Sequence, residues 1–431
     1  MKSLLAKVNA KLNAQGGFLK AVSILVGGTV FAQGITILAL PILTRLYTPE
    51  EFSLFAIYTS LLMTLSVVSC LRFEIAIPIA KHKSEAIDLV VLSFISNIII
   101  SILLFLLVLF FQKDFINLIK EPDFNNLIWL VPLGVFLLGI YNIFQYWATR
   151  EKLFTTISKT RMVQSISGVV VQISMGLGGF AAIGLVLGQI IKVSSGSIHL
   201  ITQFYKSTKE LVSGISYQSL VRSFKKNQDF PKYSALEALM NSAALQLPII
   251  FIASVVGGAE AGFLMLAMQV MAIPIAFIGN AISQVYLANA TEKLQDGQLK
   301  KYTLDCIFKL VKLGILPLVT ISLISPFIFP ILFGAEWKRA GEMVVWMMPW
   351  FVMQLLVSPI SMSLHIMAKQ KIALIIQAIG LFIRLGGLIV FSLFFSSYVF
   401  EYYALSGFLF YLIYFIIVLA MINLAEKMAT N

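Results

Sequence analysis

Long apolar stretches alternate with short polar stretches along almost the whole chain. A helix rises about 1.5 Å per residue, so about 20 apolar residues cross the hydrocarbon core of a bilayer. By that measure the pattern predicts about twelve membrane-spanning helices. They run near 21–43, 52–71, 87–111, 125–147, 161–180, 183–204, 234–256, 261–288, 303–333, 342–366, 372–395 and 399–424. The ninth contains Pro317, Pro326 and Pro330, which predict a kink or a break.

The composition agrees with a membrane protein. Hydrophobic residues make up 59% of the 431 residues and charged residues only 12%, whereas about a quarter of a soluble domain is charged. The mean hydropathy of +0.92 leaves too little polar surface to cover a water-soluble globule. The chain is therefore predicted to be an all-α polytopic membrane protein. This excludes a water-soluble nucleic-acid-binding protein, despite the net charge of +12.

The positions of Lys and Arg predict the orientation of the chain. Of the 32 basic residues, 25 fall in the N-terminal arm, in alternate loops and in the C-terminal tail, which places both termini in the cytoplasm. Five fall on the opposite side, and Lys192 and Arg384 lie inside spans. The basic face also favours anionic lipid headgroups. No segment has the pattern of a removed signal peptide.

The longest cytoplasmic connection divides the spans into two groups of six. We expect an interfacial arm over 1–20, an N-lobe over 21–204, a linker over 205–232 and a C-lobe over 233–431. Because six is even, both lobes enter the membrane in the same sense, as in transporters with parallel repeats. Within the linker, apolar and basic side chains alternate over 220–226, which suggests an interfacial helix or, equally, a basic tether.

Lys192 and Arg384 lie near the predicted midplane, where charges usually face a protein interior or a water-filled cavity. We therefore expect both to line a substrate cavity, since no acidic residue lies at comparable depth. Polar side chains on the same or neighbouring helices are the other candidates for this cavity. They are Gln189, His199, Gln377, Gln354 and Asn280. The alternative for these uncharged residues is hydrogen bonding between helices.

The remaining candidates for chemistry are few. Glu237, near the start of the seventh span, is a candidate for ion coupling, although it would also complement the helix dipole. The three His residues are scattered, two Cys cannot supply a Cys-rich metal site, and no Gly-rich phosphate loop occurs. The sequence thus predicts a protein that is not an enzyme and has no cofactor or metal.

Three blocks carry a family resemblance: PILTRLYTPE over 41–50, LRFEIAI over 71–77, and a third block between 231 and 285 that includes IGNAISQV over 278–285. Covering about a quarter of the chain, they resemble the bacterial polysaccharide flippases of the Wzx type. That family belongs to the multidrug/oligosaccharidyl-lipid/polysaccharide exporter superfamily. The resemblance implies a MATE-like fold of two six-helix lobes around a central cavity that opens alternately to each side. It also implies a multi-pass protein of the bacterial inner membrane.

The implied activity is translocation of an undecaprenyl-diphosphate-linked oligosaccharide, such as an O-antigen unit of lipopolysaccharide, from the cytoplasmic to the periplasmic leaflet. Lys192 and Arg384 would attract the diphosphate. Candidate partners are this glycan, membrane lipids, a polysaccharide polymerase and a chain-length regulator. We expect a monomer and no nucleic-acid partner. The alternatives are a multidrug or cation antiporter, a lipid II flippase, a non-transporting assembly subunit and an integral-membrane transferase.

The signature residues also have local physical roles. Thr48, Pro49 and Glu51 predict an N-cap, a first-turn proline and a capping box at the start of the second span. The charged signature residues, Arg45, Arg72 and Glu74, are candidates for a gate or for structural anchors.

Overall fold

The computed structural model describes residues 17–212, 216–367 and 369–430. Most of the interfacial arm predicted over 1–20 therefore lies outside the described residues. Within them the chain folds into helices and turns, without a strand. Eleven helical segments of the described chain are long and apolar enough to span a membrane. They are Gly27–Leu46, Pro49–Ser69, Lys83–Ile119, Leu130–Arg150, Ala181–Lys209, Phe230–Val256, Glu260–Gly279, Leu299–Phe333, Ala335–Ile360, Lys371–Ser392 and Ser396–Glu426.

The prediction of an all-helical membrane protein is confirmed, with one difference in the count. The fifth predicted span corresponds to α6 (Phe154–Leu177), a helix of 24 residues. Its length would cross a bilayer, but its polar residues exclude it from the segments that qualify by composition. The polarity of α6 has a structural reason, described below, because three of its polar side chains line the cavity of unit 1.

The chain divides into two compact units. Among the described residues, unit 1 comprises 17–46, 62–115 and 123–239, and unit 2 comprises 47–61, 116–122 and 240–430. Helix α3 (Pro49–Ser69) contributes to both, since its first part packs with unit 2.

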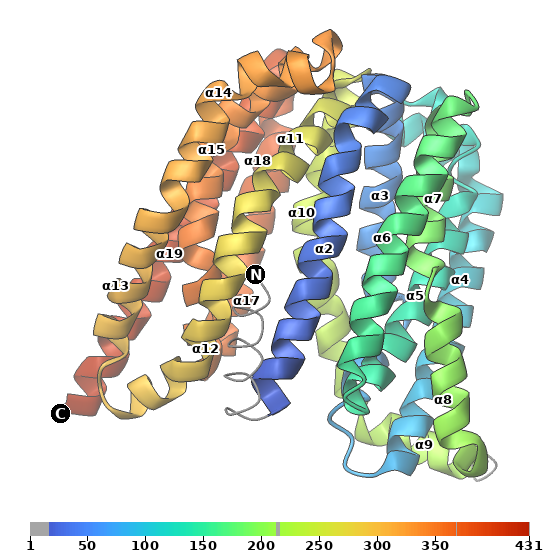
Figure 1. Ribbon diagram of the computed structural model, residues 1–431, viewed down its shortest axis with the longest axis vertical. Coiled ribbons are helices and arrows are strands. Elements are labelled where there is room, and N and C mark those ends of the chain that lie inside the picture. Colours follow the sequence, from blue (N-terminus) through green and yellow to red (C-terminus); the bar gives the residue numbers. More distant parts are fainter. Residues whose placement is uncertain (1–16, 213–215, 368, 431) are drawn as a thin grey trace, which may run out of the picture. The chain divides into compact units, whose positions relative to one another are not determined.

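Unit 1 is built from α2 (Gly17–Leu46), the C-terminal part of α3, and α4 to α9. The latter are α4 (Lys83–Ile119), α5 (Leu130–Arg150), α6, α7 (Ala181–Ser194), α8 (Ser197–Val212) and α9 (Tyr217–Lys226). Helix α6 packs between α2 and α7 (Figure 1). The spans predicted over 161–180 and 183–204 are separated by a turn, because α6 ends at Leu177 and α7 begins at Ala181, with Gly179 at a φ of 72°.

Unit 2 contains the first part of α3, most of α10 (Ala235–Val256), and the later helices. These are α11 (Glu260–Pro274), α12 (Asn280–Gln295), α13 (Leu299–Leu310), α14 (Leu316–Phe333), α15 (Lys338–Ile360), α16 (Ser363–Ile366), α17 (Gln370–Leu381), α18 (Gly387–Ser392) and α19 (Val399–Thr430). Helix α15 packs against α11, α14 and α19.

Several long helices of unit 2 are interrupted by a π-turn. In such a turn the backbone hydrogen bonds join residues five apart instead of four apart. The turns are η4 (Ile275–Gly279), η5 (Val311–Ile315) and η7 (Phe382–Gly386). In the ninth predicted span η5 lies just before Pro317, whereas Pro326 and Pro330 lie inside α14 without interrupting it.

The start of α3 shows the predicted capping box. The backbone amide of Thr48 donates to Glu51 Oε2 at 2.9 Å, and the amide of Glu51 donates to Thr48 Oγ1 at 3.3 Å. Further along α3, Phe52 makes an edge contact with Trp337 at a centroid distance of 4.9 Å, and Phe263 of α11 contacts the same indole at 5.8 Å. These aromatic contacts fix the first part of α3 within unit 2.

Candidate functional site

A polar cavity of about 210 Å³ lies within unit 1, between α2, α6 and α7. Its lining is mostly polar. It consists of Thr29, Ala32, Gln33 and Thr36 from α2, Arg161, Gln164 and Ser165 from α6, and Lys192 from α7. Two of these side chains are cationic and none is acidic. The cavity is therefore suited to anions and hydroxyl groups.

The helix spacing of the sequence explains how these side chains converge. Arg161, Gln164 and Ser165 lie three or four residues apart, which places them on one face of α6. On that helix Gly168 leaves room for the stem of Lys192, because a Cβ atom on Gly168 would lie 2.7 Å from the Lys192 Cβ. The close packing of α6 on α7 thus brings Lys192 into the cavity.

Hydrogen bonds tie α6 to α2 along the cavity wall. Arg161 Nη1 donates to Thr29 Oγ1 at 2.6 Å, and Ser165 Oγ donates to the carbonyl oxygen of Ala32 at 2.6 Å. The hydroxyl groups of Thr36 and Ser165 are 3.2 Å apart. Among the ion pairs of the described residues, none includes Lys192 or Arg161. The positive charge of the cavity is therefore not neutralised by a carboxylate of unit 1.

The other predicted cavity residues do not line this cavity. In unit 1, Gln189 is buried on α7 and His199 is exposed on α8. In unit 2, Gln354 and Gln377 are partly buried on α15 and α17. Asn280 begins α12, but its side chain lies outside what the structure describes. Their proposed contact with a substrate stays a prediction.

Arg384 occupies a different environment from Lys192. It lies in η7 of unit 2, with only 1% of its surface exposed. The guanidinium carbon is 4.4 Å from the ring centroid of Trp350 and 5.1 Å from that of Tyr403, a cation–π arrangement. Its Nη2 donates to the Tyr403 hydroxyl at 2.9 Å, while its buried Nε has no hydrogen-bond partner. In this conformation Arg384 is enclosed by aromatic rings, and its role toward substrate stays a prediction.

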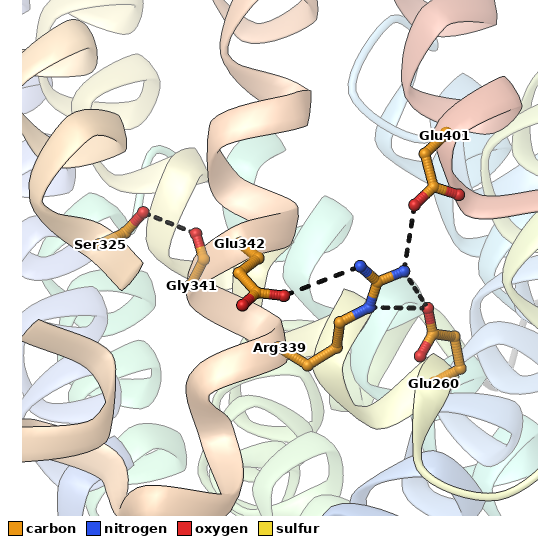
Figure 2. Close-up of polar contacts among 6 residues, drawn as sticks. All are labelled: Glu260, Ser325, Arg339, Gly341, Glu342 and Glu401. Carbon is orange, nitrogen blue, oxygen red and sulfur yellow. Dashed lines mark hydrogen bonds and ion pairs between the residues drawn. The ribbon is translucent and has the colours of Figure 1, made fainter. Parts of the chain in front are cut away.

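A second charged cluster in unit 2 joins the first turns of three helices (Figure 2). Arg339 of α15 lies 2.9 Å from Glu260 of α11 and 3.2 Å from Glu401 of α19, and Glu342 is 3.9 Å away. The carboxylates of Glu260 and Glu401 complement the N-termini of α11 and α19, and Arg339 offsets their mutual repulsion. This network ties α11, α15 and α19 together at one end.

The signature residues Arg72 and Glu74 follow α3 in a strained turn. Leu71 and Arg72 have φ values of 50° and 63°, in the left-handed region that side chains rarely adopt. Arg72 Nη1 lies 3.8 Å from Glu74 Oε1, while the buried Glu74 Oε2 has no hydrogen-bond partner. Burial raises the pKa of Glu74 from 4.5 to about 7, although a backbone hydrogen bond and Arg72 oppose this.

The remaining predicted residues are exposed. Arg45 lies in the last turn of α2, and Glu237 lies in the first turn of α10. Glu237 thus has the position that complements a helix dipole. Among the described residues, no three His, Cys, Asp or Glu side chains gather into a metal-binding group.

Sequence reasoning missed Arg161, because it is the first residue of the span predicted over 161–180, where a basic residue usually marks the cytoplasmic end. The available signal was its spacing, since Arg161 precedes Gln164 by three residues and continues the polar face of the same helix by one turn. The Arg339 network was missed as well, because its members come from three separate helices.

Comparisons with known proteins agree with the helical architecture. The structure of the lipid II flippase MurJ in an inward closed conformation matches with a TM-score of 0.70 and 14% identity, covering 94% of this chain and 90% of that one. An inward-facing multidrug resistance MATE family transporter of the MOP superfamily matches with a TM-score of 0.63 and 14% identity, covering 94% and 95%. A MOP superfamily transporter from Pyrococcus furiosus, described as having a binding pocket of reverse polarity, matches with the same TM-score and identity, covering 94% and 96%. These likenesses show the fold.

The family is shown by sequence. No curated protein sequence matches the chain. The family model for polysaccharide biosynthesis proteins, however, matches residues 42–342. This range includes two of the three signature blocks and nearly all of the block at 41–50, so the resemblance found in the sequence is confirmed. The chain belongs to the family of polysaccharide biosynthesis proteins, with the fold of the MOP superfamily transporters.

Proposed function

We propose that this protein is a flippase that moves an undecaprenyl-diphosphate-linked oligosaccharide from the cytoplasmic to the periplasmic leaflet of the bacterial inner membrane. The observation that carries the proposal is the acid-free cavity of unit 1, with Arg161 and Lys192 in its lining. The polysaccharide family supports the glycan, and the shared fold with a protein named as a lipid II flippase supports the lipid-linked form.

The mechanism requires no covalent chemistry. A diphosphate bearing a polar glycan cannot cross hydrocarbon unaided, because loss of its hydration is too costly. The cavity replaces that hydration, with Arg161 suited to bidentate contact with phosphate oxygens and Lys192 acting as a point charge. Gln33 and Gln164 present amide groups to sugar hydroxyls. The isoprenoid tail remains in lipid, and the two lobes open alternately to each side.

The chief alternative, a multidrug or cation antiporter, has less support. An organic cation needs an unneutralised acid in an apolar cavity. The apolar cavity of unit 2, about 470 Å³, contains Glu401 among aromatic residues that include Trp346 and Tyr402. However, Arg339 pairs with Glu401 and compensates its charge.

Reconstituted protein tests the proposal directly. Purified chain in proteoliposomes should move a fluorescent undecaprenyl-diphosphate oligosaccharide between leaflets, detected by the fraction that a membrane-impermeant reductant bleaches. Arg161→Glu and Lys192→Glu should each abolish movement. Lys159→Glu is the matched control, because Lys159 is an exposed base of α6, the helix that carries Arg161, and does not line the cavity.

Full activity in the double variant Arg161→Glu/Lys192→Glu would refute the assignment of this cavity. Failure of the native protein to flip the lipid would instead favour a non-transporting assembly subunit. The same vesicles test ion coupling, for which Glu237 remains the proposed residue: an imposed proton or sodium gradient should change the rate, and Glu237→Gln should remove that response.

A further inference from the structure

Helix α9 (Tyr217–Lys226) is held against the first turns of α4 by a buried carboxylate. Asp88 of α4 is only 7% exposed, and each of its oxygens accepts a hydrogen bond from a serine of α9. Ser219 Oγ donates to Oδ1 at 2.9 Å, and Ser223 Oγ donates to Oδ2 at 3.0 Å. Because the two serines lie one turn apart, this pair of bonds fixes the rotation of α9 about its own axis.

Two further contacts reinforce that orientation. Lys226 Nζ lies 2.6 Å from Glu85 Oε1, one turn before Asp88 on α4. The rings of Phe73 and Phe224 lie 5.6 Å apart. The serines therefore form the centre of the docked face of α9, and Phe224 contacts Phe73 at its edge while remaining partly exposed.

The face that remains is both aromatic and basic. Tyr217 is 82% exposed and Phe224 is 44% exposed. Arg222 and Lys225 are exposed beside them. Exposed aromatic and basic side chains on one helix are typical of a helix that lies in the membrane interface. The aromatic rings enter the headgroup boundary, and the basic groups contact lipid phosphates.

The chain also fixes the depth of α9. Only three residues separate its end at Lys226 from the candidate span that begins at Phe230, a reach of about 14 Å at most. Asp88 lies five residues after Lys83, the start of another candidate span. Both connections place α9 at the level of the lipid headgroups.

We propose that α9 is a lipid-contacting element whose exposed face binds the anionic headgroups of the leaflet on this side of the membrane. Arg222 and Lys225 contact the phosphates, Tyr217 and Phe224 enter the headgroup boundary, and Asp88 holds the helix in the required rotation. The inference rests on unit 1 alone and is independent of the transported substrate.

The experiment places a probe on the exposed face. Tyr217→Cys can be labelled with an environment-sensitive fluorophore, because the two native cysteines, Cys70 and Cys306, are buried. The labelled full chain is placed in nanodiscs of phosphatidylcholine, or of phosphatidylcholine mixed with phosphatidylglycerol, with equal fractions of brominated lipid. Quenching should be stronger in the anionic nanodiscs.

Charge variants separate lipid binding from simple proximity. Each base near an anionic surface changes the ratio of headgroup-bound to released α9 about fivefold. Arg222→Gln/Lys225→Gln should therefore lower that ratio, as measured by quenching, roughly 25-fold. Lys300→Gln/Lys301→Gln, which removes the same charge from α13, should leave the quenching unchanged. Asp88→Ala, checked for a monodisperse fold, should weaken quenching in both lipids because α9 loses its fixed rotation.

Equal quenching in the two lipids, or equal effects of the two charge variants, would overturn the proposal. A probe that brominated lipid quenches in neither nanodisc would also overturn it, since the exposed face would then lie in water, away from the bilayer. Unchanged quenching in Asp88→Ala would refute the orienting role of Asp88.

Discussion

Gly262 of α11 lies against the carbonyl oxygen of Pro49 at the start of α3, so closely that a Cβ atom on Gly262 would overlap with it. The same Cβ would lie 2.9 Å from the amide nitrogen of Ser53. Both neighbours are backbone atoms of a helical first turn, which cannot move aside as a flexible side chain can. The two helices therefore approach each other backbone to backbone at this point of unit 2.

Gly262→Ala should therefore destabilise the protein by about 1–3 kcal/mol, the usual cost of overpacking. The apparent melting temperature of purified protein in detergent measures the effect. Gly27→Ala is the control, because nothing lies within 4 Å of a Cβ at Gly27 and alanine favours the helix. An unchanged melting temperature in Gly262→Ala would contradict the close approach.

Arg384 should separate stability from transport. A buried charge is costly unless an opposite charge compensates it, and no ion pair of the described residues includes Arg384. Arg384→Met should therefore melt at the same or a higher temperature than the native protein, and yet flip lipid-linked glycan more slowly. Native transport rates in this variant would show that Arg384 has only a packing role.

The Arg339 network should behave as a coupled unit. Arg339→Gln leaves Glu260 and Glu401 facing each other without a cation, and should lower stability by about 1–3 kcal/mol. Adding Glu401→Gln to that variant removes one of the two repelling charges and should restore part of the loss. A double-mutant cycle of melting temperatures measures this coupling, and strict additivity would argue against it.

Glu74 should give the stability a distinct pH dependence. Its pKa is about 7 in the folded protein against 4.5 ordinarily, so the folded state binds more protons between these values. Stability should consequently fall as the pH rises from 4.5 to 7, by at most about 3 kcal/mol, and then level off. Melting temperatures between pH 5 and pH 8 measure this fall.

The variant Glu74→Gln should show a smaller fall, and its melting temperature should exceed that of the native protein by more at pH 8 than at pH 5. Glu292→Gln, which changes an exposed carboxylate of α12, is the control. Parallel pH profiles for native protein and Glu74→Gln would show that another group titrates in this range.

The cavity itself depends on two bases of different kinds. Arg161 is held by a hydrogen bond to Thr29, whereas the aliphatic stem of Lys192 packs against Gly168 on its way into the cavity. Lys192→Arg should retain part of the transport activity because charge is conserved, while Lys192→Gln should lose most of it. The rate of leaflet exchange in proteoliposomes measures both, and equal rates for the two variants would show that the charge of Lys192 is unimportant.

Local rules predicted much of this fold, because the signals lie within single segments. Apolar run lengths located the spans, and Thr48 with Glu51 located the capping box at the start of α3. Lys192 was found for a similar reason, since a lone charge in an apolar run is visible without knowledge of its neighbours.

The remainder depends on tertiary packing. Arg161 stands at the first residue of the span predicted over 161–180, which is the usual place of a basic residue at a membrane surface, and the packing of α2 on α6 shows that it lines a cavity. The environment of Arg384 could not be predicted either, because Trp350 and Tyr403 come from two other helices. For α9, the apolar periodicity was visible, but the docked face was decided by Asp88, more than a hundred residues earlier.

The aromatic enclosure of Arg384 also constrains how the protein is made. An arginine at the centre of a lone helix costs about 2.5–3.5 kcal/mol when the translocon releases that helix into lipid. Trp350 has already been synthesised at that moment, but Tyr403 emerges 19 residues after Arg384. The segment around Arg384 should therefore wait beside the translocon and enter the bilayer together with α19 as a hairpin, and a nascent chain truncated before Tyr403 should insert poorly.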